Sequence, residues 1–407
     1  MERSILHCDC NSFFASVELL SRPDLKNVPV AVGGSEANRH GIILAKNEAA
    51  KKYNIQTAET VQSALRKCPQ LTLLPPHHAL YSKYSKLVNA IYARYTDKVE
   101  PFGIDESWLD ITHTCHLFAP NAEALAHRIR EEVKAQTGLT ISVGVSFNKV
   151  FAKLGSDYKK PDAVTCIPRE KVKEIVWPLP VGALLYAGKA AQRTLGDVGI
   201  FTIGQLAAAS PENISALLGK LGAELSRYAR GLDDAPVLSA DERPAIKSVG
   251  NGLTFRRNLI GEADCTAGVY SLADEVAGRL RKHGLYANGV QVSIKDTQLK
   301  TLQRQLQLPT PTHLARDIGS AAMQLLRSNW NLAVPIRMLT VTAINLTDDC
   351  KQQLSLFEDR VVPGDKREQL EKSMDTIRAK YGRTAIGAAH ALHNDIGIDD
   401  VENNDAD

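Results

Sequence analysis

Residues 99–112 read VEPFGIDESWLDIT, a segment that is both apolar and acidic and that contains no basic residue. It lacks the spacing of an amphipathic helix, so it predicts a β-hairpin. Helical periodicity in 80–95 and 122–136 lies on either side of it, and strand-like runs occupy 5–9 and 140–145. This alternation predicts an α/β or α+β domain of about 165 residues built around the hairpin.

Two adjacent acids, Asp105 and Glu106, lie inside this hydrophobic hairpin, and Asp9 ends the first strand. Carboxylates are costly to bury unless a cation balances them. Hard oxygen ligands favour Mg²⁺, and two such ions about 4 Å apart stabilise the attacking and leaving oxygens of a phosphoryl displacement. The acids therefore predict a metal-dependent phosphoryl-transfer site. Asp110, deeper in the second arm, is expected to be structural.

The seven cysteines are odd in number and widely spaced, which favours free thiols in a reducing cytoplasm over disulfides. The string HCDC at 7–10 resembles a zinc site at first. No CxxC pair accompanies it, and neighbouring strand residues point to opposite faces, so zinc is disfavoured. Cys8 is expected to pack as a small buried hydrophobe.

The composition is that of a globular protein: 407 residues, 44% hydrophobic and 23% charged, enough for several domains. No apolar run approaches about 18 residues and the start leads straight into a strand, so neither a membrane span nor a secretory signal is expected. The net charge of +3 is uneven, because 241–347 carry +5 and 395–407 carry −6. Without the acidic end the chain is clearly basic, which indicates a nucleic-acid partner.

Four strings together resemble the Y-family DNA polymerases, in particular the bacterial DNA polymerase IV (DinB) type. They are ILHCDCNSFFASVE at 5–18, ILAKNEAAKKY at 43–53, the hairpin string, and SVGVSFNKVFAKLGSDYKKP at 142–161. The resemblance covers about residues 1–347 and implies translesion, template-directed DNA synthesis of low fidelity without proofreading. It also implies an α+β multidomain fold shaped like a right hand.

The subdomains of that hand can be assigned along the chain. We expect a ferredoxin-like palm (1–10 and 74–168), small fingers (11–73), a helical thumb with a helix-hairpin-helix (169–232), a linker (233–247), an α/β little-finger domain (248–347) and a tail (348–407).

By the same resemblance, Asp9 and Asp105 bridge two Mg²⁺ ions, and Glu106 completes the ion nearest the primer 3′-hydroxyl. The backbone carbonyl of Cys10 is a further ligand. The primer 3′-hydroxyl attacks the α-phosphate of a dNTP, and pyrophosphate leaves. Phe14 falls at the position of the family's steric gate, which leaves no room for a ribose 2′-hydroxyl, while Phe13 is expected to be core.

The triphosphate requires cations. Lys160 matches the family's phosphate-binding lysine. In the fingers, where the family commonly has a tyrosine and then an arginine three residues later, this chain has Glu48 and Lys51. Lys46 is expected to compensate, with Glu48 positioning one of the lysines. The alternative is that these fingers lysines form a solvated helix face.

Contacts to DNA are expected from the thumb and the little finger. The segment 184–210 resembles a helix-hairpin-helix, in which amides after Gly188 face a DNA phosphate at a helix N-terminus. On the little finger, we expect salt-sensitive contacts to the DNA backbone from four basic residues: Arg256, Arg257, Lys295 and Arg337.

The tail contains QLSLF at 353–357, which resembles the motif that binds the bacterial sliding clamp (β subunit). Gln353, Leu354, Leu356 and Phe357 would fill the clamp pocket. The alternative is a short strand or a helix edge. A helix is predicted at 365–381, and the acidic end is expected to be disordered.

The leading hypothesis is therefore a monomeric translesion polymerase that uses primer-template DNA, dNTPs and the clamp. A UmuC-type catalytic subunit that needs accessory proteins is an alternative, because AKNEAAKKY has some likeness to that branch. A non-catalytic adaptor on DNA and clamp is a third reading. The intact Asp9, Asp105 and Glu106 argue against it.

Overall fold

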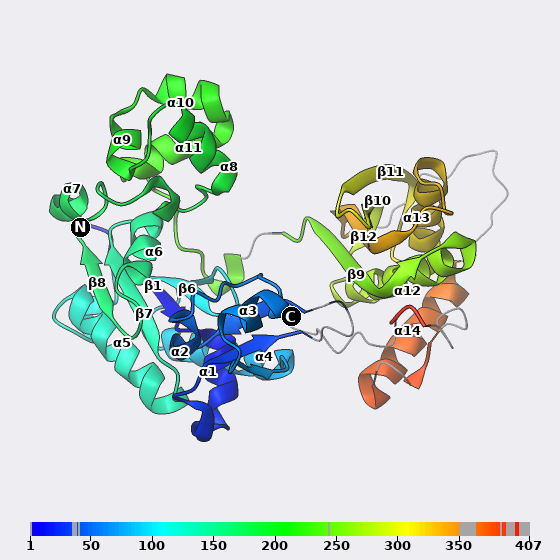
Figure 1. Ribbon diagram of the computed structural model, residues 1–407, viewed down its shortest axis with the longest axis horizontal. Helices are drawn as coiled ribbons and strands as arrows, with labels where there is room; N and C mark the ends of the chain where they lie inside the picture. The colour runs from blue at the N-terminus through cyan, green and yellow to red at the C-terminus, as the bar shows by residue number, and fades with distance from the viewer. Residues whose placement is uncertain are drawn as a thin grey trace. The chain divides into compact units, whose positions relative to one another are not determined.

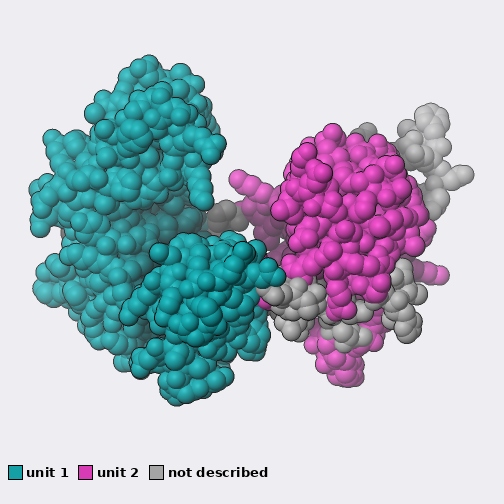
Figure 2. Space-filling model, in the orientation of Figure 1, with its two compact units in different colours: residues 1–33, 43–243, 405–407 teal, residues 34–42, 244–404 magenta. Residues whose placement is uncertain are grey.

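A computed structural model describes residues 2–34, 39, 41–242, 245–349, 364–382, 385–387 and 395–398 (Figure 1). The chain divides into two compact units (Figure 2): unit 1 comprises 1–33, 43–243 and 405–407, and unit 2 comprises 34–42 and 244–404. None of the helices in the described ranges combines the length and the apolar composition of a membrane span. The six cysteines in these ranges are free thiols.

A five-stranded sheet forms the centre of unit 1. Its order is β5-β6-β1-β7-β8, and β1 runs antiparallel to both β6 and β7. The bounds are β1 (Ile5–Cys10), β5 (Val99–Pro101), β6 (Glu106–Asp110), β7 (Ile141–Ser146) and β8 (Val164–Ile167). The predicted hairpin is confirmed, since β5 and β6 pair antiparallel. The edge strand β8, parallel to β7, had no prediction, because four residues are too few to show a period.

Helices cover both faces of this sheet. On one face, Leu6 and Cys8 of β1 pack with Tyr81 of α4 (His78–Tyr92), and with α1 (Phe13–Leu20) and α5 (Ala122–Thr137). On the other face lies α6 (Lys149–Tyr158), where Ala152 packs with Ile5. Because strand side chains alternate, the odd-numbered residues of β1, including Asp9, point to the α6 face.

The close approach of α6 to the sheet depends on Gly144 of β7. A Cβ at this position would lie 1.8 Å from the carbonyl oxygen of Ala152 and 2.4 Å from the backbone nitrogen of Ser156. We predict that Gly144→Ala lowers the free energy of unfolding by roughly 3 kcal/mol, because the helix must move off the strand. Urea unfolding measures this.

Gly278→Ala is the matched control, since the nearest atoms to its Cβ would be side-chain atoms at 3.7 Å and 3.8 Å. It replaces a glycine inside a helix, so stability should be unchanged or rise by up to about 1 kcal/mol. An unfolding midpoint for Gly144→Ala equal to that of the wild type would contradict the close packing.

Unit 1 also contains a smaller sheet and a helical cluster. The small sheet has the order β3-β2-β4, and its elements are β2 (Val30–Gly33), β3 (Ile43–Lys46), β4 (Thr72–Leu74), α2 (Glu48–Lys51) and α3 (Val61–Lys67). Helix α2 is a single turn, which Asn47 caps by accepting a hydrogen bond from the backbone nitrogen of Ala50.

The short helices expected after 169 are confirmed: α7 (Val172–Ile175), α8 (Lys189–Asp197), α9 (Ile203–Ala208), α10 (Pro211–Leu218) and α11 (Lys220–Ala229). They share one apolar core. Five single 3-10 turns complete the described elements: η1 (Pro23–Leu25), η2 (Cys115–Leu117), η3 (Arg169–Lys171), η4 (Val181–Ala183) and η5 (Ala240–Glu242).

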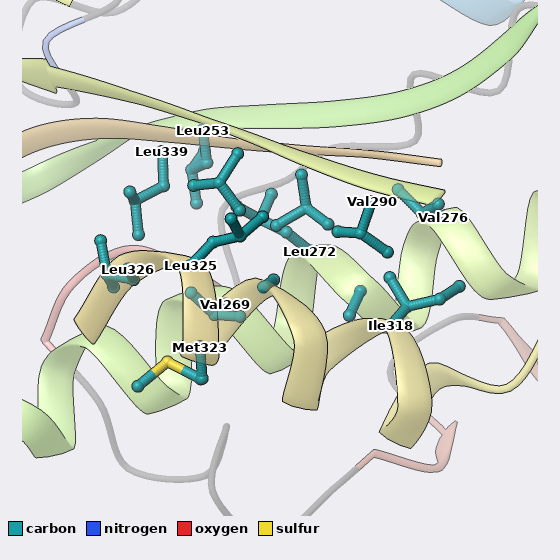
Figure 3. Packing of buried hydrophobic residues seen from close by; sticks show 14 of the residues in the cluster. Leu253, Val269, Leu272, Val276, Val290, Ile318, Met323, Leu325, Leu326 and Leu339 are labelled. Carbon is teal, nitrogen blue, oxygen red and sulfur yellow. The ribbon is translucent and has the colours of Figure 1, made fainter. Parts of the chain in front are cut away.

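Unit 2 is a four-stranded antiparallel sheet with two helices on one face (Figure 3). Its order is β11-β10-β12-β9, and its elements are β9 (Ser248–Leu259), α12 (Gly261–Lys282), β10 (Tyr286–Asp296), β11 (Thr301–Thr312), α13 (Ala315–Asn329) and β12 (Ile336–Thr347). Strand β11 runs to Thr312 and contains Pro309 and Pro311. Its two prolines are tolerated because β11 is an edge strand.

The C-terminal part of the chain adds to unit 2. Helix α14 (Gly364–Tyr381) lies against α12, where the Arg281 guanidinium binds Asp375 at 2.6 Å and also binds Glu371. Farther along, Ile396 and Ile398 are buried in the core of unit 2. The expectation of a disordered acidic end is therefore wrong for residues 395–398, because apolar side chains between the acids find a hydrophobic site.

Candidate active site

The three predicted acids meet at the end of β1. Asp9 on β1 pairs with Glu106 on β6, so both side chains lie on the face covered by α6. Asp105 directly precedes β6, and its carbonyl oxygen accepts a hydrogen bond of 2.9 Å from the backbone nitrogen of Cys10. Neighbouring residues within a strand point to opposite faces of the sheet. Asp105 lies outside the strand, so its side chain can lie on the same face as that of Glu106.

Two lysines from the α6 segment neutralise part of this cluster. The Lys160 amine lies 2.7 Å from Asp9 and 2.8 Å from Asp157, and the Lys153 amine donates to Glu106. Burial alone would lower the pKa of Lys160, but the two aspartates outweigh it and raise that pKa. Lys160 is therefore a cation held against Asp9 and Asp157.

The electrostatics of the acids differ. Burial and the charges of Asp9 and Glu106 raise the pKa of Asp105 to about 6. Burial would also raise the pKa of Glu106, but hydrogen bonds from His7 and Lys153 lower it to about 2. The ring of buried His7 lies 3.4 Å from Glu106 and its other nitrogen lies 2.8 Å from the Ser156 hydroxyl. The three acids thus carry more negative charge than the two lysines neutralise, and the excess charge is centred on Asp105.

The donor set suits a hard divalent cation, because it offers carboxylate oxygens in a partly buried site with surplus negative charge. As the side chains stand, no three His, Cys, Asp or Glu residues in the described ranges converge as a metal site. The amines of Lys153 and Lys160 instead contact the carboxylates. Metal ligation by Asp9, Cys10, Asp105 and Glu106 therefore stays a prediction.

The predicted steric gate, Phe14, stacks on a second aromatic side chain. The ring of Phe14 stacks on Tyr81 with centroids 4.0 Å apart and planes 11° apart, and His78 meets it edge-on. The Tyr81 hydroxyl donates to the buried carboxylate of Glu18, which also binds His77. Phe13 is buried with 3% exposure, as expected for a core residue. Phe14 is thus only partly buried and rigidly backed.

The fingers lysines form a separate group. The Lys51 amine lies 2.5 Å from Glu48, whose carboxylate also accepts a hydrogen bond of 3.2 Å from the Ser12 hydroxyl. The Lys46 amine donates to Thr57 at 3.0 Å. The prediction that Glu48 positions a lysine agrees with this geometry, and the lysine is Lys51.

Comparisons with known proteins place the chain in a family. Residues 8–157 match the impB/mucB/samB family, and residues 246–356 match the C-terminal domain of that family. The chain is 46% identical over 387 residues to DNA polymerase IV of Acetivibrio thermocellus. The aligned region covers 95% of this chain and 96% of that protein. It is 36% identical over 390 residues to DNA polymerase IV of Moorella thermoacetica, with 96% of each chain covered.

The chain belongs to the impB/mucB/samB family. A solved Y-family DNA polymerase chimera shares the fold, with a TM-score of 0.74 over 84% of this chain and 98% of that chain, at 21% identity. The expected resemblance to Y-family polymerases is confirmed, and so are the α+β multidomain fold and the enzyme class, a DNA-directed DNA polymerase. The boundaries of the hand's subdomains stay predictions.

The predicted DNA contacts of this polymerase lie on several elements and differ in exposure. Gly188 precedes α8, and a Cβ there would meet nothing within 4 Å. Arg256 alternates with buried Phe255, and Lys295 with buried Ile294, so both lie on the helix-free face of the unit 2 sheet. Arg337 lies at a register shift between β9 and β12 and is half-buried.

The guanidinium of Arg257 is held by two acids. It binds Asp264 at 2.5 Å and Asp395 at 2.7 Å. A DNA phosphate that binds Arg257 would have to compete with both acids. The clamp-binding candidates Gln353, Leu354, Leu356 and Phe357 lie outside the described residues.

Sequence reasoning missed Lys153 and His7, both of which contact Glu106. Lys153 lies in the same quoted string as Lys160, so the string contains the signal. The position of α6 against the sheet determines which lysine contacts which acid. No periodicity in the local sequence encodes that position. In the sequence, His7 stands next to two cysteines, and this context suggests a zinc ligand rather than a partner of Glu106.

Proposed function

We propose that this polymerase extends primers across damaged templates by two-metal-ion nucleotidyl transfer, with Asp9, Asp105 and Glu106 as the acidic centre. The observation that carries this proposal is the gathering of the three carboxylates at the end of β1, opposite two lysines of the α6 segment. Two Mg²⁺ ions, held by these acids and the Cys10 carbonyl, would supply Lewis-acid stabilisation of the transferred phosphoryl group.

The chain's own residues perform the remaining tasks. Lys160, whose amine already faces an acid of the centre, balances the charge of the triphosphate. Asn11 keeps that lysine's loop in place, since its side-chain oxygen accepts a hydrogen bond of 2.9 Å from the backbone nitrogen of Asp162. Phe14, backed by Tyr81, excludes a 2′-hydroxyl from the sugar position. Catalysis then rests on positioning and on charge neutralisation.

Bypass is tested by running-start primer extension on an undamaged template and on matched templates with an abasic site or a bulky base adduct. We expect full-length product on at least one damaged template from the purified chain alone. Products that always end one nucleotide before the lesion would contradict translesion function. Extension only after addition of accessory proteins would favour the UmuC-type alternative.

We further propose that residues 353–357 bind the sliding clamp and that the polymerase is a cytoplasmic monomer. Replacing Leu356 and Phe357 together by alanine should lower clamp affinity on the order of a hundredfold, since each buried apolar side chain contributes roughly 1.5–3 kcal/mol. The measurement is the ratio of extension with clamp to extension without it, which should fall to about one.

Leu370→Ala is the control, because Leu370 is an exposed leucine of α14, outside the motif, with 61% exposure. Its clamp stimulation should equal that of the wild type. Undiminished stimulation in the Leu356/Phe357 double variant would exclude this motif as the clamp site.

A further inference from the structure

One of the fingers lysines, Lys51, is paired with an acid of its own helix. Glu48 begins α2, and its Oε1 atom lies 2.5 Å from the Lys51 amine. Both side chains remain partly exposed, Lys51 by 38% and Glu48 by 48%, so a solvent-borne anion has access to the pair. An exposed pair of this kind is weak and exchangeable.

A second amine belongs to the same group. Burial and the charge of Lys51 lower the pKa of Lys46, whereas the charges of Glu59 and Glu48 raise it. The Glu59 carboxylate is paired with Lys67 at 2.7 Å. The Glu48 carboxylate contacts Lys51 directly, while the Lys46 amine donates to Thr57.

The same carboxylate reaches the loop after β1. Its Oε1 atom accepts a hydrogen bond of 3.2 Å from the hydroxyl of Ser12, which caps α1 and has a left-handed backbone with φ 49°. Ser12 lies between Cys10 and Phe14, the predicted ion ligand and the predicted steric gate. Glu48 therefore stands between the fingers lysines and the loop that borders the proposed triphosphate position.

We propose that Glu48 sets the dNTP affinity of this polymerase by competing with the triphosphate for Lys51. The inference rests on the proposed function, because it takes the lysine group as part of the nucleotide site. A bound triphosphate has to displace the Glu48 carboxylate from Lys51, and part of the attraction between lysine and phosphate is lost in that exchange. The residue thus keeps the dNTP concentration needed for synthesis high.

The test uses Glu48→Gln, which keeps the shape of the side chain and removes its charge. The dissociation constant of a nonhydrolysable dNTP from the enzyme on primer-template DNA should fall roughly two- to fivefold, the range for one exposed ion pair. KM for the matched dNTP should fall by the same factor, with kcat unchanged. The difference from wild type should shrink at high salt.

Glu262→Gln is the matched control. Glu262 is also an exposed acid paired with a single arginine, Arg327, with 52% exposure, but it lies on α12 of unit 2. Its dNTP affinity should equal that of the wild type.

A double-mutant cycle with Lys51→Met separates competition from a purely structural role. In the Lys51→Met background, Glu48→Gln should leave the dissociation constant nearly unchanged, because the competed cation is gone. Equal effects of Glu48→Gln in both backgrounds, or no tighter binding in the single variant, would overturn the inference. Tighter binding with no extension by any variant would instead contradict the proposed function.

Discussion

Replacing Asp105 by asparagine together with Glu106 by glutamine is expected to stop primer extension. The amides keep the shape of both side chains but remove the charges that, in the proposed mechanism, hold the ions that neutralise the phosphoryl group. We expect kcat to fall on the order of a thousandfold or more, because charge stabilisation of the transition state is a dominant contribution. Single-nucleotide incorporation on a primed template measures it.

Two accompanying measurements make this result specific. Primer-template binding should persist in the double variant, since the expected DNA contacts lie on other elements. Asp110→Asn is the control. The Asp110 carboxylate accepts hydrogen bonds from the backbone nitrogen and the hydroxyl of Thr112, so its role is to stabilise the end of the hairpin. This variant should retain extension. Substantial extension by the Asp105/Glu106 variant would exclude these residues as the acidic centre.

Replacing Phe14 by valine is expected to admit ribonucleotides. The Phe14 ring is only partly buried and stacks on Tyr81, so in the proposed site it would present a firmly backed surface to the sugar. Removing the ring opens space for a 2′-hydroxyl. The ratio of kcat/KM for a dNTP to that for the matching rNTP should fall on the order of a hundredfold.

Phe13→Leu is the control for this experiment. Phe13 is buried among apolar residues, so its loss should lower stability by roughly 1–2 kcal/mol without changing the choice of sugar. Phe14 would not be the gate if Phe14→Val left the discrimination between dNTP and rNTP unchanged, or if that discrimination were lost in Phe13→Leu instead.

The sequence predicted the parts of the fold that local patterns encode. The hairpin around Asp105 and Glu106 was predictable because its segment is apolar, lacks a helical period and contains turn residues. The helix predicted at 365–381 is confirmed as α14 (Gly364–Tyr381). Strand β8 was not predictable, since four residues next to a longer strand carry no independent signal.

The site was predicted less completely than the fold. The acids were found because charged residues in an apolar segment demand a partner. The pairing of Lys153 with Glu106, and the stacking of Phe14 on Tyr81, depend on how α6 and α4 lie against the sheet. Likewise, the burial of Ile396 and Ile398 depends on a tertiary site that the acidic composition of the chain end conceals.

Template-directed insertion of single nucleotides is the property that defines a DNA polymerase. The purified chain is supplied with a primed DNA template, Mg²⁺ and each of the four dNTPs in turn, and the template base opposite the first insertion is varied. We expect one-nucleotide extension in which the preferred dNTP changes with the template base, and no extension when Mg²⁺ is removed by chelation. Absence of extension, or insertion that ignores the template base, would contradict this expectation.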